Sequence, residues 1–193
     1  MRWQNFFSEI EQEFEAALGA EERDHHNDEL RLVWAQTSLQ ARLAHSCATR
    51  PQLEIELGGV SLAGEVAACG WDWISGEFTT QGATRAKYCV IPSRNIEISH
   101  LDCACLPQAL DQVGSVASRI PLSIVLRDLA RRRRAVDAML HSGRAVTGTI
   151  QRVGKDWCDL APHGAAEVLP TGPHINEVTL SLRHITYLTV YER

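Results

Sequence analysis

The sequence lacks the features that mark membrane, secreted and zinc-binding proteins. It has no run of about 18 apolar residues, and no basic and apolar leader opens it. The six cysteines include no CxxC pair, which argues against a zinc knuckle or a disulfide framework and favours reduced thiols that pack as small apolar side chains. We therefore expect a cytoplasmic protein that holds no cofactor or metal and does not contact a membrane.

The motifs of the common enzyme classes are also missing. The sequence contains no nucleophile elbow, P-loop, dinucleotide glycine fingerprint or HExxH motif, so we expect a protein that is not an enzyme. It lacks an excess of positive charge as well, because the formal net charge is −5. Such a chain does not coat nucleic acid by bulk electrostatics, and any nucleic-acid binding must be local.

What the chain does contain is an internal repeat. The segments "GEVAACGWDW" and "GTIQRVGKDW" begin at Gly64 and Gly148 and share glycine, aspartate and tryptophan at the same places. Self-similarity of this kind predicts two modules of one fold. At a constant offset, the matched residues are Gly59, Leu62, Gly64, Val66, Gly70, Asp72 and Trp73 against Gly143, Val146, Gly148, Ile150, Gly154, Asp156 and Trp157. After a longer loop in the second copy, Val90, Arg94, Ile96 and Ile98 match Thr179, Arg183, Ile185 and Tyr187.

Hydrophobic periodicity predicts the same order of elements in both copies. Each module begins with a helix, predicted over residues 27–46 in the first copy, and continues with five short strands of alternating apolar and polar residues. The predicted boundaries are residues 1–26 for an acidic amphipathic helix and turn, 27–101 for module 1, 102–119 for a linker and 120–193 for module 2.

The acidic helix predicted over residues 1–18 is a candidate docking element. Its aromatic and aliphatic residues recur at three- and four-residue steps, and glutamates fill much of the opposite face. An interfacial membrane helix would carry a basic polar face, so this one is expected to pack on its own chain, on a second copy or on another protein.

The repeated glycines, aspartates and tryptophans have structural explanations. Gly59 and Gly143 suit hairpin turns that need a positive φ. The mid-strand Gly64 and Gly148 allow a sharp bend, which predicts that each five-stranded sheet curls into a small barrel. Asp72 and Asp156 are expected to hold the following turn through backbone amides rather than to act as acid or base. Trp73 and Trp157 are expected to plug one end of each barrel, with an exposed stacking role as the alternative.

A helix followed by five bent strands, with "LGGVSLAGEV" in the first pair and "VIPSRNIEI" in the last, resembles the Sm-like fold of the Sm, LSm and Hfq proteins. This resemblance covers about residues 38–101 and 122–191. It implies small barrels that join the fourth strand of one to the fifth strand of a neighbour, and it implies RNA binding through loops at one face. The residues that contact RNA in that family do not match, because Pro92-Ser93 and Ser181-Leu182 stand where the family has an Arg/Lys-Gly pair.

The whole arrangement, an opening "MRW", an acidic helix and two such modules, also resembles a family of actinobacterial proteins sometimes labelled Fis-like regulators. That resemblance implies no particular activity. A Fis-type helix-turn-helix is disfavoured, because the arginine-rich helix of module 2 runs directly into strand residues without a second helix after a tight turn.

The strongest local charge is "RDLARRRR", which ends the helix of module 2. Arginines at a helix C-terminus are favourable with the helix dipole, so a solvated helix end is one interpretation. The others are a phosphate-binding patch and a docking site for an acidic partner. A second candidate set, Arg94 and Arg183 with Asn95 and His184, precedes the last strand of each module. The alternative role of these two arginines is to pair with Asp72 and Asp156 across the barrel mouth. The candidate nucleic-acid-binding residues are Arg131, Arg132, Arg133, Arg134, Arg94, Arg183 and His184.

Two functional hypotheses follow from these observations. In the first, the protein is a non-enzymatic regulator or adaptor that binds nucleic acid, RNA more than DNA, through its arginines. In the second, it is a protein-interaction scaffold that self-assembles through the edges of Sm-like barrels and through the N-terminal helix, and it binds no nucleic acid. The fold resemblance and the arginines favour the first, whereas the net charge and the missing Arg/Lys-Gly pairs favour the second.

Overall fold

A computed structural model describes residues 27–49, 52–101, 116–162 and 177–191, and the acidic helix predicted over residues 1–18 lies outside them. Residues 27–36 are helical, and the chain then breaks at residues 37–38 before α2 (Leu39–Thr49), so the single helix expected over 27–46 is wrong. Ser38 explains the break, because its Oγ accepts a hydrogen bond from the amide of Ala41 and caps α2. Among the described residues no helix is long and apolar enough to cross a membrane.

Module 1 has five strands. Alternation in β1 buries Leu53, Ile55 and Leu57 and leaves the residues between them exposed. The hairpin to β2 turns at Gly58 and Gly59, whose φ values are both positive, as expected for Gly59. The strands are β1 (Gln52–Leu57), β2 (Val60–Cys69), β3 (Trp73–Thr80), β4 (Lys87–Pro92) and β5 (Ile98–Ser99), with a 3-10 turn, η1 (Ser93–Asn95), before β5.

Module 2 repeats this order. A 3-10 turn, η3 (Val116–Arg119), leads into α3 (Leu122–Arg131), and the first hairpin turns at Gly143 with a positive φ, as expected. The strands are β6 (Ala135–Leu140), β7 (Ala145–Val153), β8 (Trp157–Pro162), β9 (Val178–Ser181) and β10 (Ile185–Val190), with η4 (Leu182–His184) between the last two. A leading helix therefore precedes five strands in both modules, as the sequence predicts.

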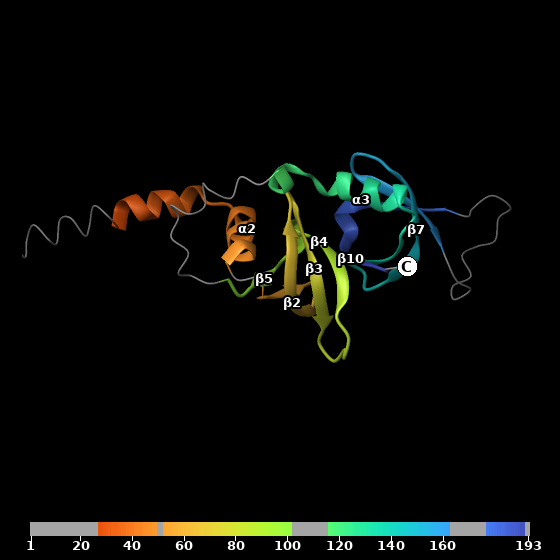
Figure 1. Ribbon diagram of the computed structural model, residues 1–193, viewed down its shortest axis with the longest axis horizontal. Coiled ribbons are helices and arrows are strands. Elements are labelled where there is room, and N and C mark those ends of the chain that lie inside the picture. The colour runs from red at the N-terminus through yellow and green to blue at the C-terminus, as the bar shows by residue number, and fades with distance from the viewer. Residues whose placement is uncertain (1–26, 50–51, 102–115, 163–176, 192–193) are drawn as a thin grey trace, which may run out of the picture.

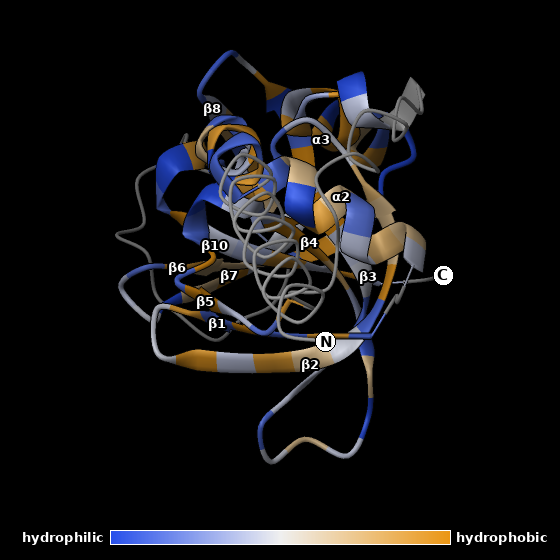
Figure 2. Cartoon of the chain, turned by 90° about the vertical axis from the view of Figure 1, so that its left-hand side faces the viewer, coloured by the Kyte–Doolittle hydropathy of each residue, from blue (hydrophilic) through white to orange (hydrophobic). Residues whose placement is uncertain are grey.

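The strands of both modules form one antiparallel sheet, in the order β5-β1-β2-β3-β4-β10-β6-β7-β8-β9 (Figure 1). The sheet is not closed into two barrels, and this corrects the barrel expectation. Closure fails because β4 pairs with β10 of the other module, while β5 is only two residues long. Figure 2 shows α2 and α3 on one side of the sheet, with the loop between β3 and β4 projecting on the other.

The repeated glycines have the bending role that their mid-strand positions predict. A Cβ on Gly64 would lie 2.0 Å from the carbonyl oxygen of Glu77, and a Cβ on Gly148 would lie 2.4 Å from that of Ala161. Neighbouring strands therefore approach more closely there than any other residue allows. The β2–β3 pairing shifts register just after Gly64, and the β7–β8 pairing shifts at the matching place. Both modules bend by the same means.

Candidate functional site

The seam, meaning the contact between β4 and β10 and the residues around it, joins the two modules through both polar and apolar contacts. Backbone pairing joins Tyr88, Cys89 and Val90 of β4 to Val190, Thr189 and Leu188 of β10. The fourth strand of module 1 thus pairs with the fifth strand of module 2. This is the kind of strand pairing that the Sm resemblance implies between neighbours.

Each module inserts an aromatic side chain into the core of the other. Trp73 of β3 and Val90 of β4 belong to the buried cluster of module 2, with Leu122 and Leu126 of α3. In the opposite direction, Tyr187 of β10 belongs to the buried cluster of module 1. Each of the two buried clusters therefore depends on side chains that the other module supplies.

The turn before β3 holds the beginning of α3. The carboxylate of Asp72 accepts a 2.7 Å hydrogen bond from the amide of Leu122, the first residue of that helix. The carbonyl of Ile120 accepts two more, from the amide of Trp71 at 3.0 Å and from Nε1 of Trp73 at 2.8 Å. The sequence predicts that Asp72 holds its own turn. Its carboxylate instead caps the first turn of α3. The N-cap residue, Pro121, makes no side-chain hydrogen bond to that turn.

Arg94 and Asn95 fasten the other side of the seam. The Arg94 guanidinium donates to the carbonyl of Leu182. Nδ2 of Asn95 lies 2.5 Å from the carbonyl of Ile185 and 3.1 Å from that of Thr186. Burial lowers the pKa of Arg94, while the charge of Asp72 raises it and that of Arg183 lowers it. Arg94 therefore already has a structural partner in the other module.

The matching residues of module 2 stand between Leu182 and Ile185, whose carbonyls Arg94 and Asn95 contact, so they lie beside the seam. Arg183 and His184, which correspond to Arg94 and Asn95, are exposed. The rings of His184 and His141 make an edge-to-face contact at 6.1 Å. Asp156 is exposed, and neither its carboxylate nor the indole nitrogen of Trp157 has a hydrogen-bond partner among the described residues. The expectation that each tryptophan plugs the end of its own barrel is therefore wrong: Trp73 is buried in the cluster of module 2, and Trp157 is 38% exposed.

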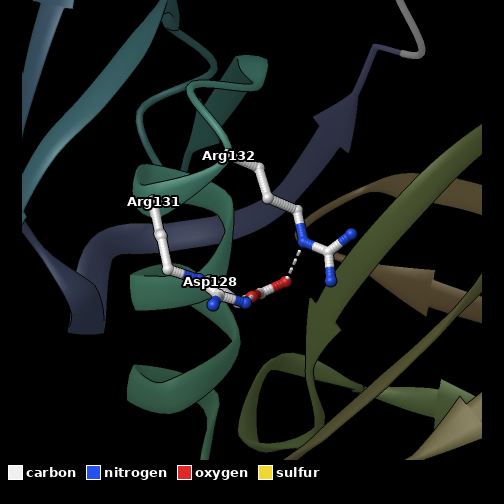
Figure 3. Close-up of polar contacts among 3 residues, drawn as sticks. All are labelled: Asp128, Arg131 and Arg132. Atoms are coloured by element: carbon white, nitrogen blue, oxygen red, sulfur yellow. Dashed lines mark hydrogen bonds and ion pairs between the residues drawn. The ribbon is translucent and has the colours of Figure 1, made fainter.

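The four consecutive arginines lie at the end of α3 and in the turn that follows. Arg131 and Arg132 both contact the carboxylate of Asp128, at 2.5 and 2.6 Å (Figure 3). The hydrogen bond from Arg131, followed by contacts with Arg132, lowers the pKa of Asp128. Arg133 turns the chain with a φ of 51°, and Arg134 is half-buried. One carboxylate thus offsets part of a cluster of four positive charges.

No protein-family model matches the chain, and no curated protein and no solved structure matches it.

Two backbone groups of the seam were not predicted from the sequence. The carbonyl of Ile120 and the amide of Leu122 carry no side-chain signature, so only the three-dimensional structure reveals them as partners of Trp73 and Asp72. Asn95 belongs to the second candidate set, because it follows Arg94 before the last strand of module 1. The structure brings Asp72, Trp73 and Arg94 together at the seam, and it places the cluster of Arg131 to Arg134 on the exposed end of α3.

Asp72 and Asp156 make a matched pair for a stability test. Asp72→Ala removes the cap of α3, so we expect the free energy of unfolding to fall by about 1 kcal/mol in urea titrations at low protein concentration. Asp156→Ala removes an exposed carboxylate and should change it by less than about 0.5 kcal/mol. Equal losses for the two variants would contradict a special role for Asp72.

Proposed function

We propose that this protein is a non-enzymatic interaction scaffold that self-assembles through the edges of its sheet, and that its modules are Sm-like units opened at β4 and β10. The observation that carries this proposal is the seam, where module-to-module association already occurs within one chain. Arg94, one of the candidate nucleic-acid-binding residues, instead fastens the seam through the carbonyl of Leu182. Its engagement favours association over RNA binding at this position.

The two outer strands support the same function. The sheet begins with β5 and ends with β9, and each of these strands pairs on only one side among the residues that the structure describes. Unpaired edge amides and carbonyls are templates for another strand. Because β5 corresponds to β10 and β9 corresponds to β4, the two edges are the same kinds of strand that already pair at the seam.

The test of self-assembly is sedimentation velocity across a concentration series. We expect the average mass of the wild-type protein to rise with concentration beyond that of a single chain. Association through sheet edges and apolar contacts should persist in about 0.5 M salt, where the Debye length is below 10 Å and surface ion pairs are screened. A single-chain species at every concentration would refute the scaffold.

A second candidate function is nucleic-acid binding through the cluster of Arg131 to Arg134. The observation that favours it is the exposure of Arg131, Arg132 and Arg133 beside one carboxylate, that of Asp128. Guanidinium groups suit phosphate, since each can donate two parallel hydrogen bonds. RNA bound here would be held by its backbone.

Binding of single-stranded RNA over a salt series tests this second function. Phosphate binding predicts that the logarithm of the affinity falls linearly with the logarithm of the salt concentration, with a slope that shrinks by about 0.7 for each phosphate that a variant no longer neutralises. The variant Arg131/Arg132/Arg133/Arg134→Ala should bind more weakly and with a smaller slope, whereas the control Arg85/Lys87→Ala removes two charges elsewhere and should not. Absence of wild-type binding at low salt rejects RNA as the ligand.

A further inference from the structure

The two leading helices pack on their modules in the same way. Each has a fully buried leucine, Leu43 in α2 and Leu126 in α3, and each contacts the second strand of its own module, β2 or β7. One turn after that leucine, each helix carries a small side chain that packs against the buried cluster of its module. This side chain is Cys47 in α2 and Ala130 in α3.

The second strands differ between the modules at their last residue. β2 ends at Cys69, and β7 ends at the matching Val153. Both side chains are partly buried and pack against the cluster of their own module. Module 2 thus has an alanine and a valine at the two places where module 1 has cysteines. Because a reduced cysteine packs as a small apolar side chain, packing alone does not require a thiol at either place.

The two cysteines of module 1 are in contact between α2 and β2. Their thiol groups are hydrogen-bonded to each other. The side chain of Gln40 in α2 holds the helix at this place, because its Nε2 lies 3.3 Å from Sγ of Cys69 and also donates to the carbonyl of Gly70. The pair therefore lies where the leading helix is fastened to the end of a strand.

Both thiols of the pair are partly accessible. Cys47 and Cys69 are partly buried, whereas Cys89 and Cys158 are buried. The hydrogen bond with Cys69 lowers the pKa of Cys47, and the same bond, followed by burial, raises the pKa of Cys69. Since the thiolate is the nucleophile, Cys47 is the member of the pair that attacks an oxidant first.

We propose that Cys47 and Cys69 are a reversible redox site, which forms a disulfide and thereby links α2 covalently to the end of β2. The oxidant is a small disulfide of the glutathione type. Contact between the two thiols, their partial accessibility and their joint replacement of an alanine and a valine carry this inference. It does not depend on the proposed scaffold function.

The reaction is two successive thiol–disulfide exchanges. The Cys47 thiolate attacks one sulfur of the small disulfide, so a mixed disulfide forms and one small thiolate leaves. Cys69 then loses its proton and attacks Sγ of Cys47, which breaks the mixed disulfide and releases the second small thiolate. Two protein thiols are oxidised and one small disulfide is reduced. The two protons that the cysteines lose are taken up by the two small thiolates.

The position of the pair gives oxidation a structural consequence. Cys69 directly precedes the turn from Gly70 to Trp73, and the carboxylate of Asp72 in that turn caps α3. In the reduced protein the hydrogen bonds of Gln40 hold α2 there. A disulfide would keep this link in the unfolded chain as well, which lowers the entropy of the unfolded chain and so stabilises the fold.

Peptide mapping of the full-length protein in glutathione redox buffers tests the site. The protein is equilibrated in buffers from reducing to oxidising, its free thiols are blocked with N-ethylmaleimide, and its peptides are identified by mass spectrometry. We expect a disulfide that joins the peptide of Cys47 to that of Cys69 in oxidising buffer and is lost again in reducing buffer. Oxidation that leaves these two peptides unlinked, or that stops at glutathione on Cys47, would overturn the proposal.

Matched variants test the effect on stability. Cys47→Ala and Cys69→Val give module 1 the residues that module 2 has at the same places, so both should fold, and circular dichroism checks this. In urea titrations the unfolding equilibrium constant of wild type should be at least about tenfold smaller when oxidised than when reduced. Each variant should give the same constant in both states.

The control Cys103→Ala/Cys105→Ala removes two thiols outside the pair and should keep the wild-type response to oxidation. Loss of the response in this control, or a full response in Cys47→Ala or Cys69→Val, would assign the effect to other thiols and overturn the proposal.

Discussion

Pairing of β4 with β10 is the constraint on which the rest of this structure depends. It removes an exposed edge from each module and buries Trp73 and Tyr187 across the junction. It also brings Asp72 to the start of α3 and Arg94 to the carbonyl of Leu182. Small β units of this size bury a limited share of their surface when alone. Sharing side chains across the seam gives both modules a larger apolar interior, and the same pairing keeps the sheet open.

Duplication explains why the outer ends resemble the seam so closely. Each copy of a repeated module carries both surfaces of the module-to-module contact. Two modules in tandem therefore form one such contact and leave one of its surfaces unused in each module. Trp157 and Asp156 of module 2, and Leu39 and Ile98 of module 1, are more exposed than their counterparts at the seam. Exposed apolar residues rimmed by polar ones are typical of interaction surfaces. The arginines at the end of α3 are a separate feature, since Arg131 and Arg132 contact Asp128 and take no part in the seam.

Local features of the fold could be predicted from the sequence, and long-range features could not. Gly59 and Gly64 have physical roles that follow from their positions in one hairpin, so the turn and the bend were predictable. The prediction of two closed barrels was wrong, because closure depends on which strand pairs with β4. That strand is β10, which lies far along the chain. The role of Asp72 could not be predicted for the same reason: its target, the amide of Leu122, has no sequence signature. Arg94 is a candidate on sequence grounds, but its engagement with a backbone carbonyl depends on tertiary structure.

The central claim is that one seam geometry is satisfied within the chain and repeated between chains. Hydrogen exchange measured as a function of protein concentration tests it most directly, because exchange reports the pairing of individual amides. Amides of β4 and β10 should be protected at every concentration, while those of β9 and residues 98–101 should become protected only as the protein associates. Rapid exchange in β4 and β10, or association that leaves β9 as exposed as in the single chain, would contradict the claim.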